Sequence, residues 1–408
     1  MELICQSLQK KQLNVRYLKM ELLEEIKQFH DEMTSWRREI HKYPELGFEE
    51  NRPSDFVAKK LKEFGIEVYR GLAKTGVVGK INNGDGPSIG LRADMDALPL
   101  EEKNSFVHAS TCPGKMHACG HDGHTAMLLG AAKYLASNKN YHGTINFIFQ
   151  PAEEGLGGAE LMLKEGLFDK FPMDSVYGLH NWPGMPAGFF GIGTGPMMAS
   201  ADFFDLTIIG RGGHAAMPDH CIDPIIVASH VISALQTIPS RNTHPVDSVV
   251  ISVTKIHAGD AYNIIPDSVC IQGTVRTFLP ETQSELPSSI SRIAEGVCNA
   301  FGATCELNYM KGYPATINSI NESEISEKAA IDLVGREKIE RNPIPSMVTE
   351  DFSYMLQAKP GCYVWLGTGP GKGNTGCMLH SSNYDFNDDV LPTGAGYWVK
   401  LVENELAT

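Results

Sequence analysis

The chain has 408 residues, of which 42% are hydrophobic, and a formal net charge of −14 at pH 7. This length accommodates one to three domains with buried cores, whereas the acidic balance argues against nucleic acid or an anionic membrane surface as the main partner. No segment approaches the roughly 20 consecutive apolar residues that a membrane-spanning helix needs.

We predict that residues 1–19 are a dispensable N-terminal extension. They lack the apolar core of a secretory signal. Met20 is an alternative start, because Leu22, Leu23 and Ile26 behind it recur at helical spacing. The nine cysteines are scattered and odd in number, which in a chain of this length indicates reduced thiols and a cytoplasmic location.

Residues 20–198 alternate between helical and strand patterns, as α/β domains do. Apolar residues at helical spacing predict one helix over 56–64 and another over 127–135. Four short apolar runs predict strands, over 76–81, 88–94, 144–150 and 175–180. Chemically active side chains in α/β sheets usually lie where such strands end.

The pattern changes near residue 199, where strand and helix patterns begin to follow the order β-α-β-β-α-β. They lie at 204–208, 227–238, 249–253, 269–275, 290–301 and 305–309. This split βαβ arrangement indicates a complete small domain, residues 199–311, inserted into a larger one. Residues 312–408 resume the earlier alternation and are expected to rejoin residues 20–198, because an inserted domain whose termini lie close together is readily accommodated.

The segment Met116 to His124 (MHACGHDGH) combines three histidines, a cysteine and an aspartate. Cys119 and His121 are one residue apart, so that an extended or turning backbone can aim both at one point. Clustered ligand types of this kind favour a divalent metal over a core or surface role. We expect His124 to cap or pack at the start of a helix, and His117 to orient a neighbouring group.

Two adjacent glutamates, Glu153 and Glu154, follow an apolar strand and Pro151 and precede a glycine-rich stretch. Adjacent glutamates usually form a solvated face. Neighbouring carboxylates at a bend can instead divide two tasks, in which one binds a metal and the other accepts a proton from water.

Four further polar residues lie near strand ends or late in the chain. Asp94 and Asp96 share one face of an extended chain and can point into one site, although a turn capped by aspartates explains them equally well. His180 and His380, taken singly, are more often structural histidines, and spacing alone does not bring them to Cys119.

The inserted domain carries three candidate residues for binding. His214 lies in a glycine-rich loop (GRGGHAAMP) of the kind that approaches a ligand or another subunit. Asn263 and Arg276 could hold a carboxylate, since arginine offers a two-pronged contact. An exposed strand position is the simpler explanation for Arg276.

Eight motifs together resemble one family. They are RADMDALP, MHACGHDGHTAM, PAEEGLGGA, GLHNWP, GRGGHAAMP, AYNIIPD, TEDFS and LHSSNYDF, in this order. The chain resembles, from about residue 30 to its end, the amidohydrolases that include hippurate hydrolase, bacterial N-acyl-amino-acid amidohydrolases and plant indoleacetyl-amino acid hydrolases. These belong with the aminoacylase and carboxypeptidase group of dinuclear metallopeptidases.

The resemblance implies a role for each candidate residue. The implied metal ligands are Cys119, His121, Glu154, His180 and His380. The implied catalytic residues are Glu153 as general base, Asp96 orienting a metal-site histidine, and His214 stabilising the oxyanion. Asn263 and Arg276 match positions that contact substrate in more distant relatives. One departure is that typical dinuclear peptidases have a histidine ligand where this chain has Asp94, while Cys119 is peculiar to this branch.

The resemblance also implies an α/β fold and a reaction. A mixed-sheet, zinc-peptidase-like catalytic domain (20–198 and 312–408) would be interrupted by a ferredoxin-like lid domain (199–311) through which homodimers or homo-oligomers form. Two divalent metal ions, Mn²⁺ or Zn²⁺ with Co²⁺ or Ni²⁺ as further options, would support hydrolysis of the linear amide of an N-acyl amino acid.

Three alternative functions are open at this stage. The first is a dipeptidase, or a deacetylase acting on an acylated diamino acid. The second is a non-catalytic protein that binds metal or amino acids, which the retention of Glu153 and all five ligands argues against. The third is a cysteine hydrolase with Cys119 as the nucleophile.

Overall fold

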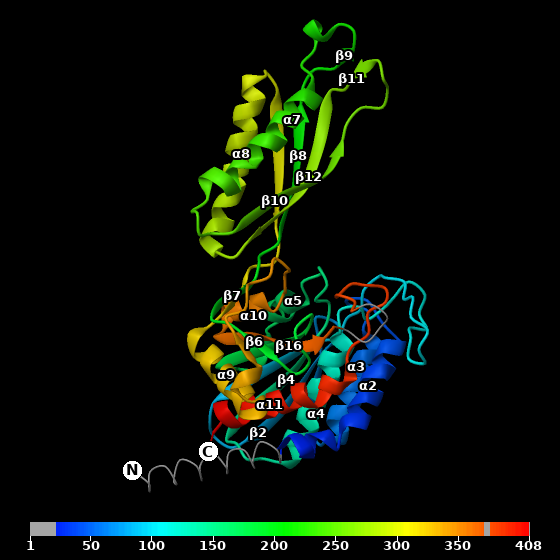
Figure 1. The fold of residues 1–408 in the computed structure, drawn as a ribbon, viewed down its shortest axis with the longest axis vertical. Coiled ribbons are helices and arrows are strands. Elements are labelled where there is room, and N and C mark those ends of the chain that lie inside the picture. The colour runs from blue at the N-terminus through cyan, green and yellow to red at the C-terminus, as the bar shows by residue number, and fades with distance from the viewer. Residues whose placement is uncertain (1–21, 371–375, 408) are drawn as a thin grey trace. The chain divides into compact units, whose positions relative to one another are not determined.

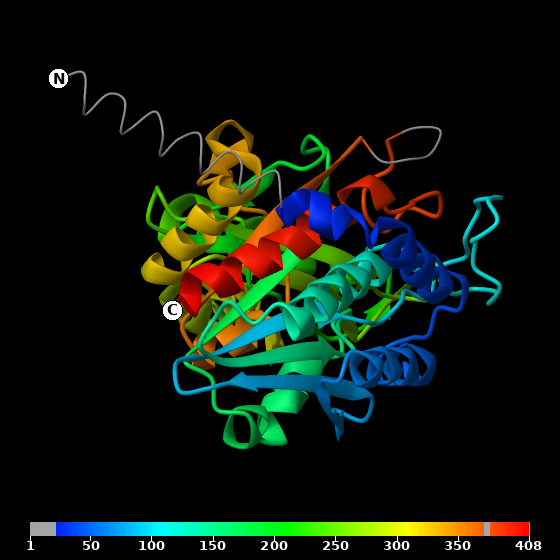
Figure 2. The ribbon, with the colours of Figure 1, turned by 90° about the horizontal axis from the view of Figure 1, so that it is seen from below.

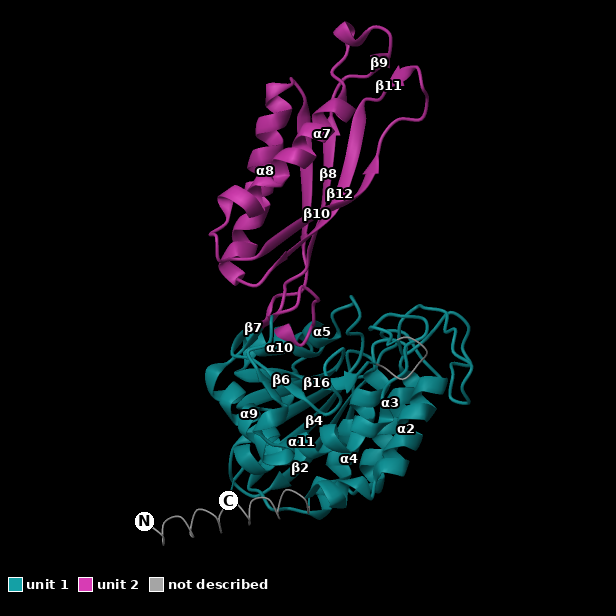
Figure 3. Cartoon of the chain, in the orientation of Figure 1, with its two compact units in different colours: residues 1–195, 317–344, 354–408 teal, residues 196–316, 345–353 magenta. Residues whose placement is uncertain are grey.

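The computed structural model describes residues 22–370 and 376–407. The predicted extension 1–19 and the alternative start at Met20 lie outside the described residues. The chain divides into two units, of which unit 1 comprises residues 1–195, 317–344 and 354–408 and unit 2 comprises 196–316 and 345–353 (Figure 3). The limits at 199 and 311 remain a prediction.

Unit 1 is built on an eight-stranded mixed sheet with the order β1-β2-β4-β3-β5-β16-β6-β15 (Figure 1). Its strands are β1 (Glu67–Leu72), β2 (Gly76–Asn83), β3 (Ser88–Asp94), β4 (Gly143–Gln150), β5 (Ser175–Pro183), β6 (Phe190–Ile192), β15 (Ile339–Arg341) and β16 (Gly361–Gly369). The central strands β4, β3, β5 and β16 run parallel to one another. On one side of them β1, β2 and β4 pair antiparallel, and on the other side β16 pairs antiparallel with β6. All of β16 and nearly all of β3 are buried, as is typical of parallel strands covered on both faces.

Helices cover this sheet. They are α2 (His30–Lys42), α3 (Asn51–Glu63), α4 (His121–Ser137), α5 (Gly158–Lys164), α6 (Leu167–Lys170), α9 (Ile320–Val334), α10 (Ser353–Ala358) and α11 (Leu391–Glu405), and residues 22–27 are also helical. Figure 2 shows α4 and α11 side by side across one face of the sheet. Nearly every residue of α4 is buried, because the helix is apolar almost all round. At Gly130 a Cβ atom would lie 2.3 Å from the Met33 sulfur, so glycine permits the close approach of α2 to α4.

Unit 2 contains a four-stranded antiparallel sheet with the order β10-β12-β8-β13. Its elements are β8 (Asp202–Ile209), α7 (Pro224–Leu235), β10 (Val249–His257), β12 (Ser268–Thr277), α8 (Pro280–Ala300) and β13 (Thr304–Lys311). Alternate residues of β8 and β12 are buried and form one core with the apolar faces of α7 and α8. The predicted β-α-β-β-α-β order and the α/β fold class are confirmed.

Some short elements of this region have no counterpart in the sequence prediction. β9 (Gly213–His214) and β11 (Ile264–Ile265) form a separate two-stranded ribbon, and β7 (Gly195–Met198) pairs with β14 (Thr316–Asn318). Within the described residues, no helix is long and apolar enough to span a membrane.

A buried arginine connects helix α2 with two distant chain segments. The Arg37 guanidinium is fully buried and donates to both carboxylate oxygens of Asp388 (2.7 and 2.9 Å) and to Asp385 (2.9 Å). It also lies 3.6 Å from Asp122, which follows His121 at the start of α4.

His41 is a second cation beside Asp122. Burial opposes protonation of His41, but hydrogen bonds to Asp122 and Glu102 raise its pKa to about 9. Protonated His41 therefore balances part of the negative charge of Asp122 and Glu102.

Arg37→Met is expected to destabilise the fold by about 3–5 kcal/mol, because it leaves buried carboxylates without their cation. Urea unfolding monitored by circular dichroism would measure the loss. Arg38→Met is the matched control. Arg38 pairs with the same Asp388 at 2.9 Å but is 49% exposed, so its loss should cost no more than about 1 kcal/mol. An equal loss of unfolding free energy in the two variants would contradict the conclusion that Arg37 is the cation on which the buried carboxylates depend.

Candidate metal centre and active site

The candidate ligands lie at the carboxyl ends of central strands and at the start of α4. His180 is near the end of β5, and the two glutamates lie in the turn that follows β4, after Pro151 and Ala152. Cys119 and His121 flank Gly120, whose φ of 95° lies in the left-handed region. A Cβ atom on Gly120 would meet the Asn181 side chain at 2.4 Å, so glycine is needed between these two ligands.

The structure brings all five predicted ligands and Glu153 into one connected cluster. Three overlapping groups have ligand atoms within 4.8 Å of one another, namely Cys119 with His121 and His180, Cys119 with Glu154 and His380, and His121 with Glu153 and Glu154. Cys119 Sγ is 3.5 Å from His180 Nε2, and His380 Nε2 is 3.2 Å from Glu154 Oε1. These side chains therefore converge although His380 lies 261 positions after Cys119 in the sequence.

Hydrogen bonds fix the orientation of two of the histidines. His121 Nδ1 lies 2.9 Å from the Asp96 carbonyl and 3.1 Å from Asp96 Oδ1, while the second Asp96 oxygen accepts from the Glu154 backbone N–H at 2.9 Å. His180 Nδ1 donates to the Asn181 carbonyl at 2.7 Å. In both rings Nε2 is left for the cluster, which is the usual arrangement around metal-binding histidines.

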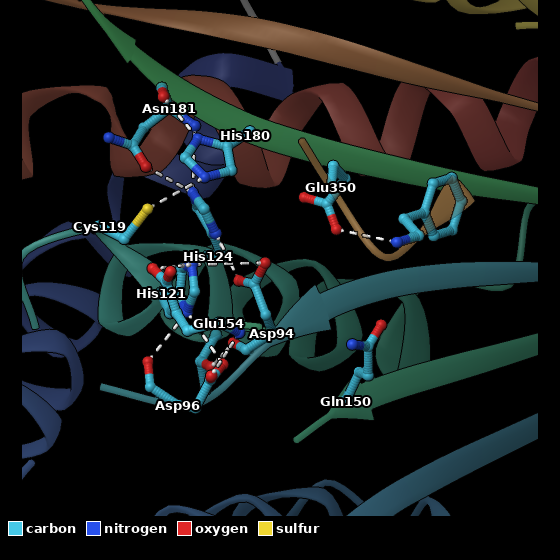
Figure 4. A network of polar contacts seen from close by, with 12 residues as sticks. Asp94, Asp96, Cys119, His121, His124, Gln150, Glu154, His180, Asn181 and Glu350 are labelled. Atoms are coloured by element: carbon cyan, nitrogen blue, oxygen red, sulfur yellow. Dashed lines mark hydrogen bonds and ion pairs between the residues drawn. The ribbon is translucent and has the colours of Figure 1, made fainter. Parts of the chain in front are cut away.

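Asp94 and His124 form a buried pair beside the cluster (Figure 4). Asp94 accepts from Arg92 at 2.8 Å and from His124 Nδ1 at 2.6 Å, and His124 Nε2 lies 2.6 Å from the Asn181 side-chain oxygen. Asp94, His121 and His124 are also close enough to share a metal. Since Asp94 and Asn181 already engage both nitrogens of His124, this pair is better suited to packing against the cluster than to binding a metal.

The electrostatics of the cluster favour a bound cation. Burial and the charge of Glu154 raise the pKa of the Cys119 thiol, so its thiolate needs neighbouring positive charge. Contacts with Cys119 and Glu154 raise the pKa of His380 to about 10, which means that the surroundings of this histidine stabilise positive charge. Burial and neighbouring His124 lower the pKa of His180 well below its usual value, which keeps that imidazole neutral, as a metal ligand must be.

One orphaned atom tests whether the residues fit a metal. Among the described residues, His121 Nε2 is buried without a hydrogen-bond partner and lies 3.7 Å from Asp94 Oδ2 and 4.0 Å from Glu154 Oε1. Buried polar atoms are rarely left unsatisfied. This atom belongs to the cluster, and the sulfur, nitrogen and oxygen donors of the cluster suit a divalent metal of intermediate softness, so the residues fit the expected metals. His117 also lacks hydrogen bonds at both ring nitrogens, and burial lowers its pKa to about 3.

The three candidates of the inserted domain lie in unit 2. His214 is exposed on β9 and pairs with Ile264 of β11, and the Asn263 carbonyl accepts from Ala215 N–H at 3.0 Å in the same ribbon. Arg276 on β12 donates to the Thr274 hydroxyl and, at 3.1 Å, to the Val275 carbonyl. The roles suggested for these residues remain predictions.

Sequence reasoning missed Glu50, which is fully buried behind the turn that bears Glu153. Its carboxylate accepts from the Ala152 N–H at 2.8 Å and from the Thr75 hydroxyl at 2.6 Å. Glu49 and Glu50 precede a helix and look like solvated acids at its start. The burial of Arg37 and His41 is easier to predict from the sequence. These two residues are spaced four apart on the same face of α2 as the buried Met33.

Burial raises the pKa of Glu50 to about 7; the hydrogen bond from Thr75 opposes this shift and the nearby Asp96 charge adds to it. A raised folded-state pKa contributes stability that is complete below the unfolded value of 4.5 and is lost as pH rises through 7. Glu50→Gln does not titrate and should gain melting temperature relative to wild type as pH rises from about 5 to about 8. Thermal unfolding across this range tests the expectation, and parallel curves would contradict it.

Comparisons with known proteins identify chains that are similar to this one over most of its length. Hippurate hydrolase of Campylobacter jejuni is 44% identical over 383 residues, which cover 94% of this chain and 98% of the relative. Thermostable carboxypeptidase 1 of Saccharolobus solfataricus is 41% identical over 390 residues, covering 92% and 97%. A solved Bacillus subtilis protein, described as a dinuclear metal binding peptidase from the M20 family, superposes with a TM-score of 0.83 at 34% identity and covers 94% of this chain and 99% of that one.

The resemblance inferred from the eight motifs is thereby confirmed. A profile described as peptidase family M20/M25/M40 matches residues 90–404, a span that begins in β3 and ends in α11. It includes every candidate ligand and catalytic residue described above. The chain belongs to peptidase family M20/M25/M40.

Proposed function

We propose that this protein hydrolyses the amide bond of N-acyl amino acids, with hippurate-like or N-acetyl substrates, and releases a carboxylic acid and a free amino acid. The observation that carries the proposal is the convergence of five ligand side chains and Glu153 into one cluster, in which the buried His121 Nε2 has no hydrogen-bond partner. The likeness to hippurate hydrolase over nearly the full length of both chains supports this substrate class.

Cys119, His121, Glu154, His180 and His380 would hold two divalent ions, Mn²⁺ or Zn²⁺ with Co²⁺ or Ni²⁺ as further options. When bound, such ions lower the pKa of water and polarise the substrate carbonyl. Asp96 would keep His121 Nε2 turned toward them through its contacts with Nδ1.

Glu153 would act as the general base and then as the acid. Its carboxylate takes a proton from the attacking water and returns it to the departing amine. The side chain is 7% exposed, so few solvent molecules compete for the proton. Its place next to Glu154 divides proton transfer and metal binding between adjacent residues.

Unit 2 would complete the site. In this proposal His214 donates a hydrogen bond to the oxyanion, and Asn263 and Arg276 bind the substrate carboxylate. Assembly through the lid domain into a homodimer belongs to the same proposal and is testable by light scattering after gel filtration. A cytoplasmic location is likewise proposed, in keeping with the eight free cysteines of the described residues.

A hydrolysis panel on metal-loaded enzyme tests the function. It would combine N-benzoyl, N-acetyl and indoleacetyl groups with several amino acids, and the freed amine would be measured. We expect turnover of acyl amino acids and none of amides that lack the free carboxylate. No turnover of any acyl amino acid by fully loaded protein would refute the proposal.

A peptidase is the second candidate function, favoured by the similarity to a carboxypeptidase over 92% of this chain. A C-terminal peptide bond is itself the amide of an N-acyl amino acid, so both functions use the same chemistry. Dipeptides with a free amino group separate the two, since only a peptidase should prefer them over their N-acetyl derivatives.

A further inference from the structure

The turn that bears Glu153 and Glu154 has a constrained backbone. Ala152 has a φ of 56°, which costs a residue with a Cβ atom roughly 1–3 kcal/mol. Local hydrogen bonds partly hold this conformation, from Gly158 N–H to the Ala152 carbonyl (2.9 Å) and from Gly155 N–H to the Glu153 carbonyl (2.7 Å). Such strain persists only where the surroundings fix the backbone.

Glu50 supplies a further restraint from a distant part of the chain. It lies 102 residues before Ala152 and accepts that residue's N–H at 2.8 Å, while its other oxygen accepts the Thr75 hydroxyl at 2.6 Å. The carboxylate is fully buried. Without an acceptor there, the Ala152 N–H would be a buried donor with no partner, which costs about 1–3 kcal/mol and favours another backbone conformation.

We infer that Glu50 is a positioning residue for the reaction, which acts through the Ala152 amide to hold the Glu153 carboxylate at its working position. This inference rests on the proposed function, in which Glu153 carries the proton. The Ala152 N–H belongs to the peptide plane that joins Pro151 to Ala152. A rotation of this plane changes the backbone angle φ of Ala152, and it displaces Glu153 because that residue follows directly. A misplacement of about 1 Å can cost about 10²-fold in rate.

Two substitutions separate the reach of this side chain from its charge. Glu50→Asp keeps the charge but is one methylene shorter, so its oxygens withdraw from the Ala152 amide. Glu50→Gln keeps the reach and one acceptor oxygen but loses the charge. We expect kcat to fall about 10- to 100-fold in Glu50→Asp, with KM little changed, and to stay near the wild-type value in Glu50→Gln.

Thr75→Val is the matched control. It removes the other hydrogen bond to Glu50 and should lower the melting temperature without lowering kcat. Amide hydrogen exchange on the metal-free protein gives a readout independent of activity. The Ala152 amide should exchange faster in Glu50→Asp than in wild type or Glu50→Gln, while amides in the middle of α9 stay unchanged.

Two outcomes would overturn the inference. One is a Glu50→Asp variant with wild-type kcat and wild-type exchange at Ala152. The other is an equal fall of kcat in Glu50→Gln or in Thr75→Val, which would make charge or general stability the cause. Failure of the proposed function is distinguishable, because it would appear as a metal-loaded wild type without turnover, whereas failure of this inference requires an active wild type.

Discussion

Glu153→Gln is expected to bind metal as tightly as wild type and to lose about 10²- to 10⁴-fold in kcat, the range that general acid–base catalysis contributes. Glutamine fills the same volume in this buried position but cannot accept a proton from water. The measurements are kcat at saturating metal and the metal content of the purified variant.

Glu154→Gln is the matched control for this experiment, since it alters the adjacent side chain by the same atoms. Its oxygen belongs to the ligand cluster with Cys119 and His380, so metal affinity should fall and added metal should restore part of the turnover. Near-normal kcat in metal-loaded Glu153→Gln would rule out Glu153 as the base.

Removal of metal by a chelator is expected to abolish turnover, and added Mn²⁺ or Zn²⁺ to restore it. In parallel, Cys119→Ala should weaken metal binding by more than the roughly 10- to 100-fold that loss of an outer partner of a ligand already causes. Raising the metal concentration should then recover activity. Isothermal titration calorimetry and metal-dependent rates provide the two measurements.

This prediction also separates a metal ligand from a nucleophile. A cysteine hydrolase would lose all activity in Cys119→Ala at every metal concentration and would resist the chelator. The raised pKa of the buried Cys119 thiol already disfavours a reactive thiolate in the absence of a cation. Cys112→Ala, a partly exposed thiol of unit 1, is the control for general effects of cysteine loss.

The fold could be predicted from the sequence wherever a segment is long and regularly patterned. The runs of β3 and β4 and the alternation in β8 gave strands close to those observed. The edge strands β1 and β15 are largely exposed, so their composition carries little signal. Their strand conformation follows from pairing with neighbours that the sequence does not reveal.

The site was predictable only where its residues are neighbours in the chain. Cys119 and His121 share one short segment, so their spacing alone indicated a metal. His180 and His380 reach the cluster through the order of strands in the sheet, and only the resemblance implied their convergence. Glu50 binds a backbone amide 102 residues away, an interaction that leaves no pattern in a single sequence.

The position of β16 bears on the order in which the protein takes shape during synthesis. Among the described residues it is the last strand, yet it lies within the unit 1 sheet between β5 and β6. The inserted residues 196–316 leave the ribosome earlier as one nearly continuous folding unit. Until β16 has emerged, the strands β1 to β5 have no strand that connects them to β6 and β15. His380 emerges after β16. We therefore expect the candidate metal centre to be among the last of the described parts to form in a newly made chain.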